Sequence, residues 1–113
     1  MKTESDFKEH LLRNLDTAEA ALHYEFRALR EMVKGLGAVG AAIHLLDLAK
    51  IGDEQKGFTL LAEAGLLHLS LEQAVLDFQE SGLFPPSIIA SARARLLIIR
   101  NKMNRKSQDI VGN

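Results

Sequence analysis

Helix-breaking residues are few in this chain, and their positions limit what it can form. Proline occurs only as the pair Pro85-Pro86, and three of the eight glycines stand close together at Gly35, Gly37 and Gly40. Between these breaks, apolar residues recur at steps of three and four, which is the spacing of an amphipathic helix. Leucine and alanine supply 19 and 14 of the 113 residues, against 14 valines, isoleucines and threonines together. Since leucine and alanine lose less side-chain freedom in a helix than β-branched residues do, the sequence predicts an all-α fold.

Four helices are predicted, in a single helical domain that covers residues 1–113. We place them at about 5–34, 38–51, 53–80 and 87–106, and we expect the tail at 107–113 to fray. Thr3 or Ser5 is placed to cap the first helix, and Pro86 suits the first turn of the fourth. Because the connections are short, we expect the helices to pack as an antiparallel four-helix bundle with two long members.

The third predicted helix is apolar on two sides. One side is a regular seam formed by Leu60, Ala64, Leu67, Leu71, Ala74 and Phe78. Leu66, Leu69 and Leu76 lie away from that seam. A helix that is apolar on two sides usually packs on two sides, so we expect a homo-oligomer, most simply a homodimer, with these three leucines at the interface. The alternative is a monomer in which the fourth helix covers the second face.

The net charge of −1 is a cancellation between two parts of the chain. Residues 1–80 hold 14 acidic and 8 basic residues, whereas residues 86–106 hold six basic residues and no acidic one. The six are Arg93, Arg95, Arg100, Lys102, Arg105 and Lys106. In a structural interpretation, their charges pair with acidic residues of the first and third helices. In a functional one, the fourth helix attracts nucleic acid or an acidic partner, although no interleaved aromatic residue supports base stacking.

Three histidines stand one helical turn from a carboxylate, which raises the question of a metal site. The pairs are Glu19/His23, His44/Asp47 and His68/Glu72. Such pairs bind zinc or iron where several of them converge inside a bundle. The chain contains no Glu-x-x-His, however, which is the motif of di-metal carboxylate bundles. We therefore interpret the pairs as surface features and predict no metal site.

Glu25 is the one polar residue that stands out of place in the predicted helical pattern. It falls towards the apolar face of the first helix and has no cation three or four residues further on. A buried carboxylate needs a partner or a proton, and His68, Arg93 and Arg95 are candidate partners from other helices. The other interpretation is a boundary residue whose carboxylate reaches water.

No motif in the sequence points to a reaction or a cofactor. The segment Gly35–Gly40 reads Gly-x-Gly-x-x-Gly, but a dinucleotide-binding loop needs a preceding strand, and here a predicted helix precedes it. The serines lie in no recognisable nucleophile motif. We therefore predict neither catalytic residues nor a cofactor.

The function that the sequence favours is a non-catalytic protein–protein interaction or regulatory module that self-associates through apolar helix faces. A nucleic-acid-associated regulator that uses the basic fourth helix is the alternative, and a metal-binding bundle is a third candidate. Cysteine is absent, and the first ten residues are polar with mixed charge. The uncharged central stretch Gly35–Leu46 is shorter than the roughly 20 residues of a membrane span. We therefore expect a cytoplasmic protein that does not enter the membrane.

Overall fold

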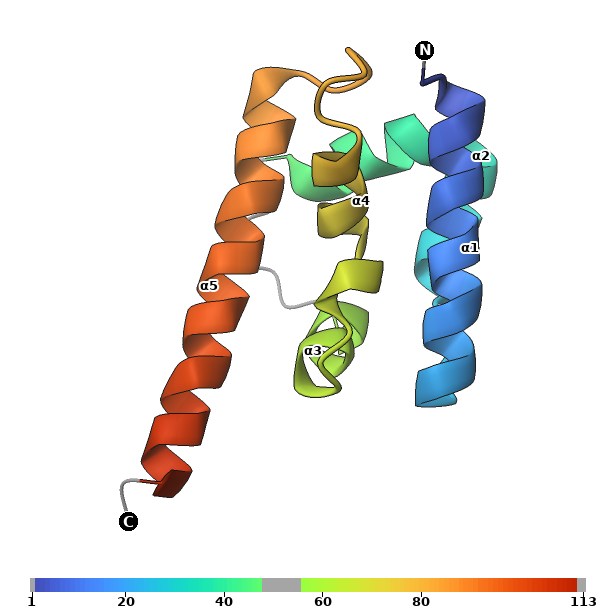
Figure 1. Cartoon of the computed structure of the whole chain (residues 1–113). Helices are drawn as coiled ribbons and strands as arrows, with labels where there is room; N and C mark the ends of the chain where they lie inside the picture. The colour runs from blue at the N-terminus through green and yellow to red at the C-terminus, as the bar shows by residue number, and fades with distance from the viewer. Residues whose placement is uncertain (1, 48–55, 112–113) are drawn as a thin grey trace.

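The computed structural model describes residues 2–47 and 56–111, with side chains as far as Arg105, and most of these residues are helical and none lies in a strand. They form α1 (Glu4–Leu22), α2 (Arg27–Leu46), α3 (Lys56–Glu63), the short 3₁₀ turn η2 (Leu67–Leu69), α4 (Leu71–Asp77) and α5 (Pro86–Val111) (Figure 1). The all-α prediction is thereby confirmed. The predicted division into four helices is not, because the described residues form five helices with other boundaries. None of these helices is long and apolar enough to cross a membrane.

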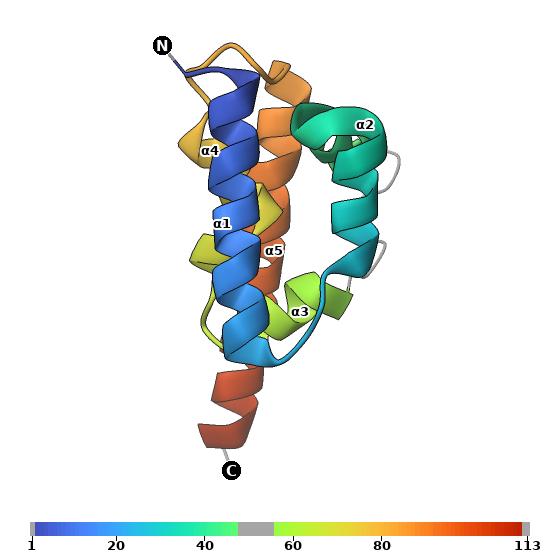
Figure 2. The same ribbon diagram turned by 90° about the vertical axis from the view of Figure 1, so that its right-hand side faces the viewer.

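The helices α1, α4 and α5 lie side by side, with the short α4 between the two longer ones (Figure 1). α1 and α5 run in the same direction, and α4 runs opposite to both (Figures 1 and 2). The predicted antiparallel bundle is therefore not confirmed. α2 packs against α1, α4 and α5, and α3 contacts α1 and α5 near the far end of α1. The C-terminal turns of α5 extend past the other helices (Figure 2).

The start of α1 is fixed by a capping box, as the sequence predicts for Thr3. The Thr3 Oγ1 accepts the backbone N–H of Asp6 at 3.2 Å, and the Asp6 carboxylate accepts the backbone N–H of Thr3 at 2.9 Å. The backbone N–H and the hydroxyl of Thr3 both donate to the Asp6 carboxylate, and they lower the pKa of that carboxyl because they favour its charged form. Two N–H groups at the helix end that would otherwise have no partner are thus satisfied by local sequence alone.

The predicted first helix at 5–34 is wrong, because a turn interrupts it where α1 ends and α2 begins. His23, the residue after α1, adopts the left-handed conformation with φ of 51°. The Glu19 carboxylate holds this turn, since it accepts the backbone N–H of Phe26 at 2.9 Å and two bonds from the Arg30 guanidinium at 2.7 and 3.0 Å. No glycine or proline marks the turn, and the apolar spacing continues across it.

The predicted break between the first and second helices becomes a bend inside α2. Gly37 there has φ of 78° and ψ of 165°, which are not helical values. Other residue types rarely adopt this φ, so glycine permits the bend. α2 therefore joins the last part of the predicted helix at 5–34 to the first part of that at 38–51, and it ends at Leu46. Residues 48–55, which include the predicted boundary of the second and third helices, lie outside the described residues.

The predicted third helix at 53–80 is wrong as well, because it is divided into α3, η2 and α4. Gly65, with φ of 72°, lies in the break after α3. Ser70 then caps α4: its Oγ accepts the N–H of Gln73 at 3.1 Å and donates to the carbonyl of Leu67 at 2.7 Å. Ser-Leu-Glu-Gln is a capping-box pattern, so the sequence does carry a signal of this helix start, which the regular apolar steps obscured.

α5 begins at Pro86, at the predicted position, but runs on to Val111. The backbone is thus helical at 107–111, within the tail 107–113 that we expect to fray, and the fraying itself stays a prediction. The physical reason is that no glycine or proline interrupts the helical pattern between Pro86 and Gly112.

Aromatic rings gather at the two ends of the core. At one end, the ring centroid of Phe7 lies 5.3 Å from that of Phe78 and 4.9 Å from that of Phe84, in edge-to-face arrangements. At the other end, beside the turn between α1 and α2, the rings of Tyr24 and Phe26 meet edge to face at 5.1 Å. Buried leucines and alanines of α1, α2 and α4 connect the two ends.

Candidate functional site

The interface candidates of the third predicted helix pack mainly within the chain itself. Leu69 is buried in the core, and Leu66 and Leu76 are partly buried against it. The break between α3 and α4 accounts for this position, because residues on either side of it no longer share one helical face. Contact of these three leucines with a second copy of the chain stays a prediction.

The basic residues of α5 fall into two groups. Arg95 is buried, whereas Arg93, Arg100, Lys102 and Arg105 are exposed. Arg93 also donates a hydrogen bond to the Gln79 side chain at 3.0 Å. The side chain of Lys106 lies outside the described residues. The structural interpretation of the basic helix therefore holds for Arg95, and the other described bases remain at the surface.

Arg95 forms a buried ion pair with Glu72 that joins α5 to α4. The Arg95 Nε donates to the Glu72 Oε2 at 2.8 Å, and the two side chains are 7% and 3% exposed. Burial raises the pKa of the Glu72 carboxyl, although the Arg95 charge acts in the opposite direction. The guanidinium also lies 5.6 Å from the ring centroid of Phe58. The sequence predicts a pair of Glu72 with His68 instead, because it places both on one continuous helix. In the structure His68 lies in η2 and Ser70 caps α4, so that helix is interrupted between them.

Large apolar side chains are exposed on α5 as well. Leu97 is 60% exposed and Ile98 is 58% exposed, and the other large exposed apolar residue of the described part is Leu36 of α2, at 54%. On a helix, Arg93 and Arg100 lie one turn before and after Leu97, and Lys102 lies one turn after Ile98. We name this group, Arg93, Leu97, Ile98, Arg100 and Lys102, the α5 outer face.

The histidine–carboxylate pairs do not converge. Glu19 binds Arg30 and Glu72 binds Arg95, so two of the three carboxylates have guanidinium partners. In residues 2–47 and 56–111, no group of three or more histidine, aspartate or glutamate side chains could hold a metal ion. A histidine–carboxylate contact that the sequence did not suggest joins His10 to Asp77 at 3.2 Å.

Glu25 lies in the turn between α1 and α2 and not on a buried helix face. Its side chain is exposed and pairs with Arg27 at 3.3 Å, also at the surface. The prediction of a carboxylate on the apolar face is therefore wrong, and the partner is Arg27 instead of one of the candidates His68, Arg93 and Arg95. The interpretation as a residue whose carboxylate reaches water is the one that agrees with its exposure.

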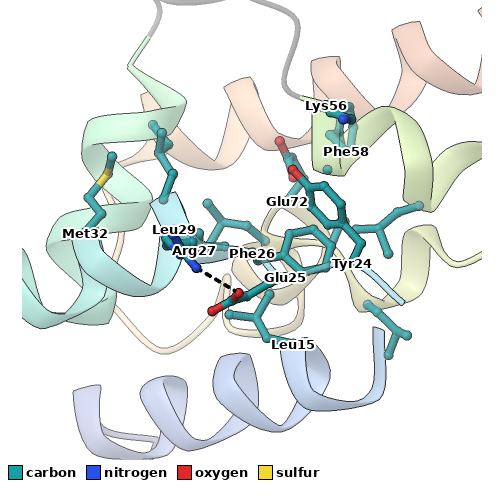
Figure 3. Close-up of a pocket in the computed structure, with 17 residues that line it drawn as sticks. Leu15, Tyr24, Glu25, Phe26, Arg27, Leu29, Met32, Lys56, Phe58 and Glu72 are labelled. Atoms are coloured by element: carbon teal, nitrogen blue, oxygen red, sulfur yellow. Dashed lines mark hydrogen bonds and ion pairs between the residues drawn. The ribbon is translucent and has the colours of Figure 1, made fainter. Parts of the chain in front are cut away.

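A cavity of about 420 Å³ lies beside this turn, and its lining includes Glu25. Its walls come from α1, the turn, α2, α3 and the segment around the start of α4 (Figure 3). Three aromatic residues, Tyr24, Phe26 and Phe58, contribute to the lining, and Glu72 lies at one side. The sequence could not indicate this cavity, because the two breaks in the predicted helices create it.

Comparisons with known proteins do not assign this chain to a family: no family model, curated protein or solved structure matches it. Its function is therefore argued from two features of the described residues, the α5 outer face and the cavity.

Proposed function

We propose that the protein is a non-catalytic interaction module that binds an acidic amphipathic helix of a protein partner on the α5 outer face. The observation that carries this proposal is the exposure of two adjacent large apolar side chains, Leu97 at 60% and Ile98 at 58%, among basic residues of the same helix. Neighbouring exposed apolar side chains rimmed by polar residues are typical of protein–protein interaction sites.

The chemistry of this face defines the partner. Leucine and isoleucine side chains gain free energy when an apolar stripe of another helix removes them from water. The bases Arg93 and Arg100 flank Leu97, so glutamate or aspartate residues beside that stripe would meet positive charge. Burial of the two apolar groups supplies affinity, while the surrounding charges select an acidic partner over a basic one.

A second copy of the chain is the competing occupant, since a homodimer is the expectation from the sequence. Two α5 outer faces packed antiparallel around Leu97 and Ile98 would bring Arg93 of one copy near Lys102 of the other. Like charges in such a contact oppose association. The charge of α5 therefore favours a different, acidic partner over a second copy.

Nucleic acid is the second competing occupant, because phosphates also attract exposed arginine and lysine side chains. Phosphate contacts would leave Leu97 and Ile98 in water, however, and the burial of Arg95 removes one of the six predicted bases from the surface. The two exposed apolar residues therefore favour a protein partner over nucleic acid.

A synthetic helical peptide tests the proposal. The probe carries leucine along one face and glutamate elsewhere, and its binding to the full-length protein is followed by fluorescence polarisation. We expect the double variant Leu97→Ser/Ile98→Ser to bind the peptide at least about tenfold more weakly, since two apolar contacts are lost. Leu36→Ser is the matched control, because Leu36 is similarly exposed but lies on α2. This variant should bind the peptide with the affinity of the wild type.

Three further measurements distinguish the occupants. A lysine-rich version of the peptide should bind more weakly than the glutamate-rich one, and equal binding would argue against charge selection. Light scattering behind a sizing column tests for a dimer. If the wild type is a dimer and Leu97→Ser/Ile98→Ser is a monomer, the occupant of the α5 outer face is a second copy of the chain and not a different protein. A low-salt retardation assay tests for nucleic acid. If the protein shifts DNA or RNA and Arg93→Gln/Arg100→Gln does not, the occupant of the α5 outer face is nucleic acid and not a protein.

A further inference from the structure

The cavity between α1, α2 and α3 is a built feature of the fold. The rings of Tyr24 and Phe26 form its aromatic wall. Glu19 positions this wall, because its carboxylate accepts the backbone N–H of Phe26 at 2.9 Å and so fixes the turn that carries both rings. Gly57 lies directly against this wall, where a Cβ would come within 2.5 Å of the Phe26 ring. The close contact at Gly57 and the bond at Glu19 show that the residues around the cavity are tightly packed.

The size of the cavity suits a small-molecule ligand. Its volume of about 420 Å³ falls in the range of sites for small organic molecules, roughly 300–1,000 Å³. Concave, largely apolar pockets of this size are the usual binding sites of small molecules. The exposed residues Glu25, Arg27 and Ala28 are part of the lining, so the cavity opens to the surface and a ligand can enter.

The walls select an apolar, ring-containing ligand. Leucines from α1, α2 and α3 form much of the lining, with Leu15, Leu29 and Leu61 among them. The rings of Tyr24 and Phe26, at 5.1 Å and edge to face, offer both a ring face and a ring edge to a third ring. A flat aromatic group fits such walls, because most of the lining is apolar and its two carboxylates already have guanidinium partners.

The charges of the lining favour an anion over a cation. Each of its two carboxylates has a guanidinium partner: Glu25 pairs with Arg27 of the lining at 3.3 Å, and Glu72 pairs with Arg95, which lies outside the lining, at 2.8 Å. The lining contains one more cation, Lys56, whose ammonium lies 5.8 Å from the ring centroid of Tyr24. This ammonium stands beside the aromatic wall, where it can pair with a carboxylate attached to a bound ring (Figure 3).

We propose that this cavity binds a small aromatic carboxylate, with its ring against Tyr24 and Phe26 and its carboxylate near the ammonium of Lys56. The site is separate from the α5 outer face, so either proposal can fail without the other. The ligand is held without covalent chemistry.

Three matched compounds test the proposal on the full-length protein by titration calorimetry. They are 4-phenylbutyrate, 4-phenylbutanol and 4-phenylbutylamine, which share a ring and a chain but differ in charge. We expect the carboxylate to bind at least about threefold more tightly than the alcohol, and the amine to bind most weakly. Equal binding of all three, tighter binding of the amine, or no binding at millimolar concentration would overturn the proposal.

Substitutions at exposed positions then locate the site. Ala28→Trp places a large ring in the lining, and it should weaken phenylbutyrate binding at least tenfold (about 1.4 kcal/mol). Ala20→Trp, on the exposed side of α1 and outside the lining, is the matched control and should bind as the wild type does. Since both positions are exposed, the fold should tolerate both changes, and circular dichroism checks this. Unchanged binding by Ala28→Trp would place the compound elsewhere and overturn the assignment.

The role of Lys56 has its own test. Lys56→Gln should lower the affinity for phenylbutyrate to about that for phenylbutanol and leave phenylbutanol binding unchanged. Lys8→Gln, an exposed lysine of α1 outside the lining, should alter neither affinity. An unchanged preference for the carboxylate in Lys56→Gln would contradict the proposed position of the charge. Leu97→Ser/Ile98→Ser should bind phenylbutyrate normally, which separates this site from the α5 outer face.

Discussion

Glu72 and Arg95 are the clearest case of single residues whose role only their surroundings define. Each is charged and almost completely buried, and each satisfies the other through a bond of 2.8 Å. Taking two charges out of water costs free energy that the pair only partly recovers. The raised pKa of Glu72 has the same cause, because burial disfavours its charged form. The pair therefore fixes how α4 meets α5 more than it stabilises the fold.

Removing one member of this pair should cost more than removing both. Arg95→Met leaves the Glu72 carboxylate buried with its guanidinium gone, and we expect a loss of about 3–5 kcal/mol in the free energy of unfolding. Glu72→Leu/Arg95→Met removes both charges and should recover most of that loss. Urea denaturation of the three proteins measures both values. An equal loss in the single and double variants would show that packing, and not the charge, governs this position.

Glu19 gives the protein a dependence on acid pH. Hydrogen bonds from Arg30, together with the backbone N–H of Phe26, lower the pKa of its carboxyl below the ordinary value of 4.5, although burial acts in the opposite direction. A lowered pKa in the folded state means that the stabilisation is present above pH 4.5 and is lost as the pH falls through the folded value. Glu72, with a raised pKa, contributes with the opposite sign, because its stabilising effect decreases as pH rises.

Glu19→Gln should therefore reduce the loss of stability in acid. At pH 7 we expect the variant to be less stable by about 2 kcal/mol, because bonds to a charged acceptor become bonds to a neutral one. The difference from the wild type should shrink as the pH falls below about 4.5. Urea midpoints between pH 7 and pH 3 measure it, and the contribution of Glu72 cancels in the comparison. Glu9→Gln, which removes only an exposed pair with Arg13, should show a much smaller difference.

At the scale of the elements, the predicted helices were too long because apolar spacing does not reveal whether a helix is continuous. Leu22 and Leu29 remain in phase although a turn lies between them, and the seam of the third predicted helix continues through η2. Glycine was the more informative residue at two places, since Gly37 and Gly65 both adopt positive φ. The turn after His23 carries no such signal.

Two glycines of α2 should respond oppositely to alanine. Gly37→Ala should destabilise the fold by about 1 kcal/mol or more, because its φ of 78° is strained for any residue with a Cβ. Gly35→Ala, two residues earlier in the same helix and with open space around the new Cβ, should stabilise it by about 0.5–1 kcal/mol. Thermal unfolding of the two variants measures the difference. Stabilisation by both substitutions would mean that the bend at Gly37 is not needed.

At the scale of the whole molecule, charge is separated between the first 80 residues and α5. Arg95 neutralises part of this separation internally through Glu72, while Arg93, Arg100, Lys102 and Arg105 stay at the surface of α5. The long helix extends past the others, so this basic surface lies partly away from the acidic remainder (Figure 2). The arrangement suits attraction of an acidic partner from solution.

Salt should therefore weaken the two proposed interactions to different degrees. Binding of the glutamate-rich peptide to the α5 outer face involves several exposed charges, and we expect its affinity to fall by about tenfold between 50 and 500 mM salt. Binding of phenylbutyrate rests mainly on apolar contacts and one ammonium, so its affinity should change by no more than about threefold. Fluorescence polarisation and calorimetry at the two salt concentrations provide the comparison. Insensitivity of the peptide would contradict its attraction to the bases.

The sequence by itself determined the all-α class, the cap at Thr3, the start of α5 at Pro86 and the need for a break near Gly37. These features depend on local physics: side-chain entropy, a hydrogen bond over three residues, or the φ that one residue permits. Such features can be predicted from the neighbouring residues alone.

Only the tertiary structure decided the turn at His23, the ion pair of Glu72 with Arg95 and the cavity beside that turn. Glu72 and Arg95 are 23 residues apart, and the Glu19 carboxylate holds a turn through residues up to 11 positions away. A periodic pattern indicates which side of a helix is apolar but not which distant residue will meet it. That choice depends on how the helices pack. Here two predicted helices are interrupted, and the resulting arrangement buries aromatic side chains and pairs a buried charge.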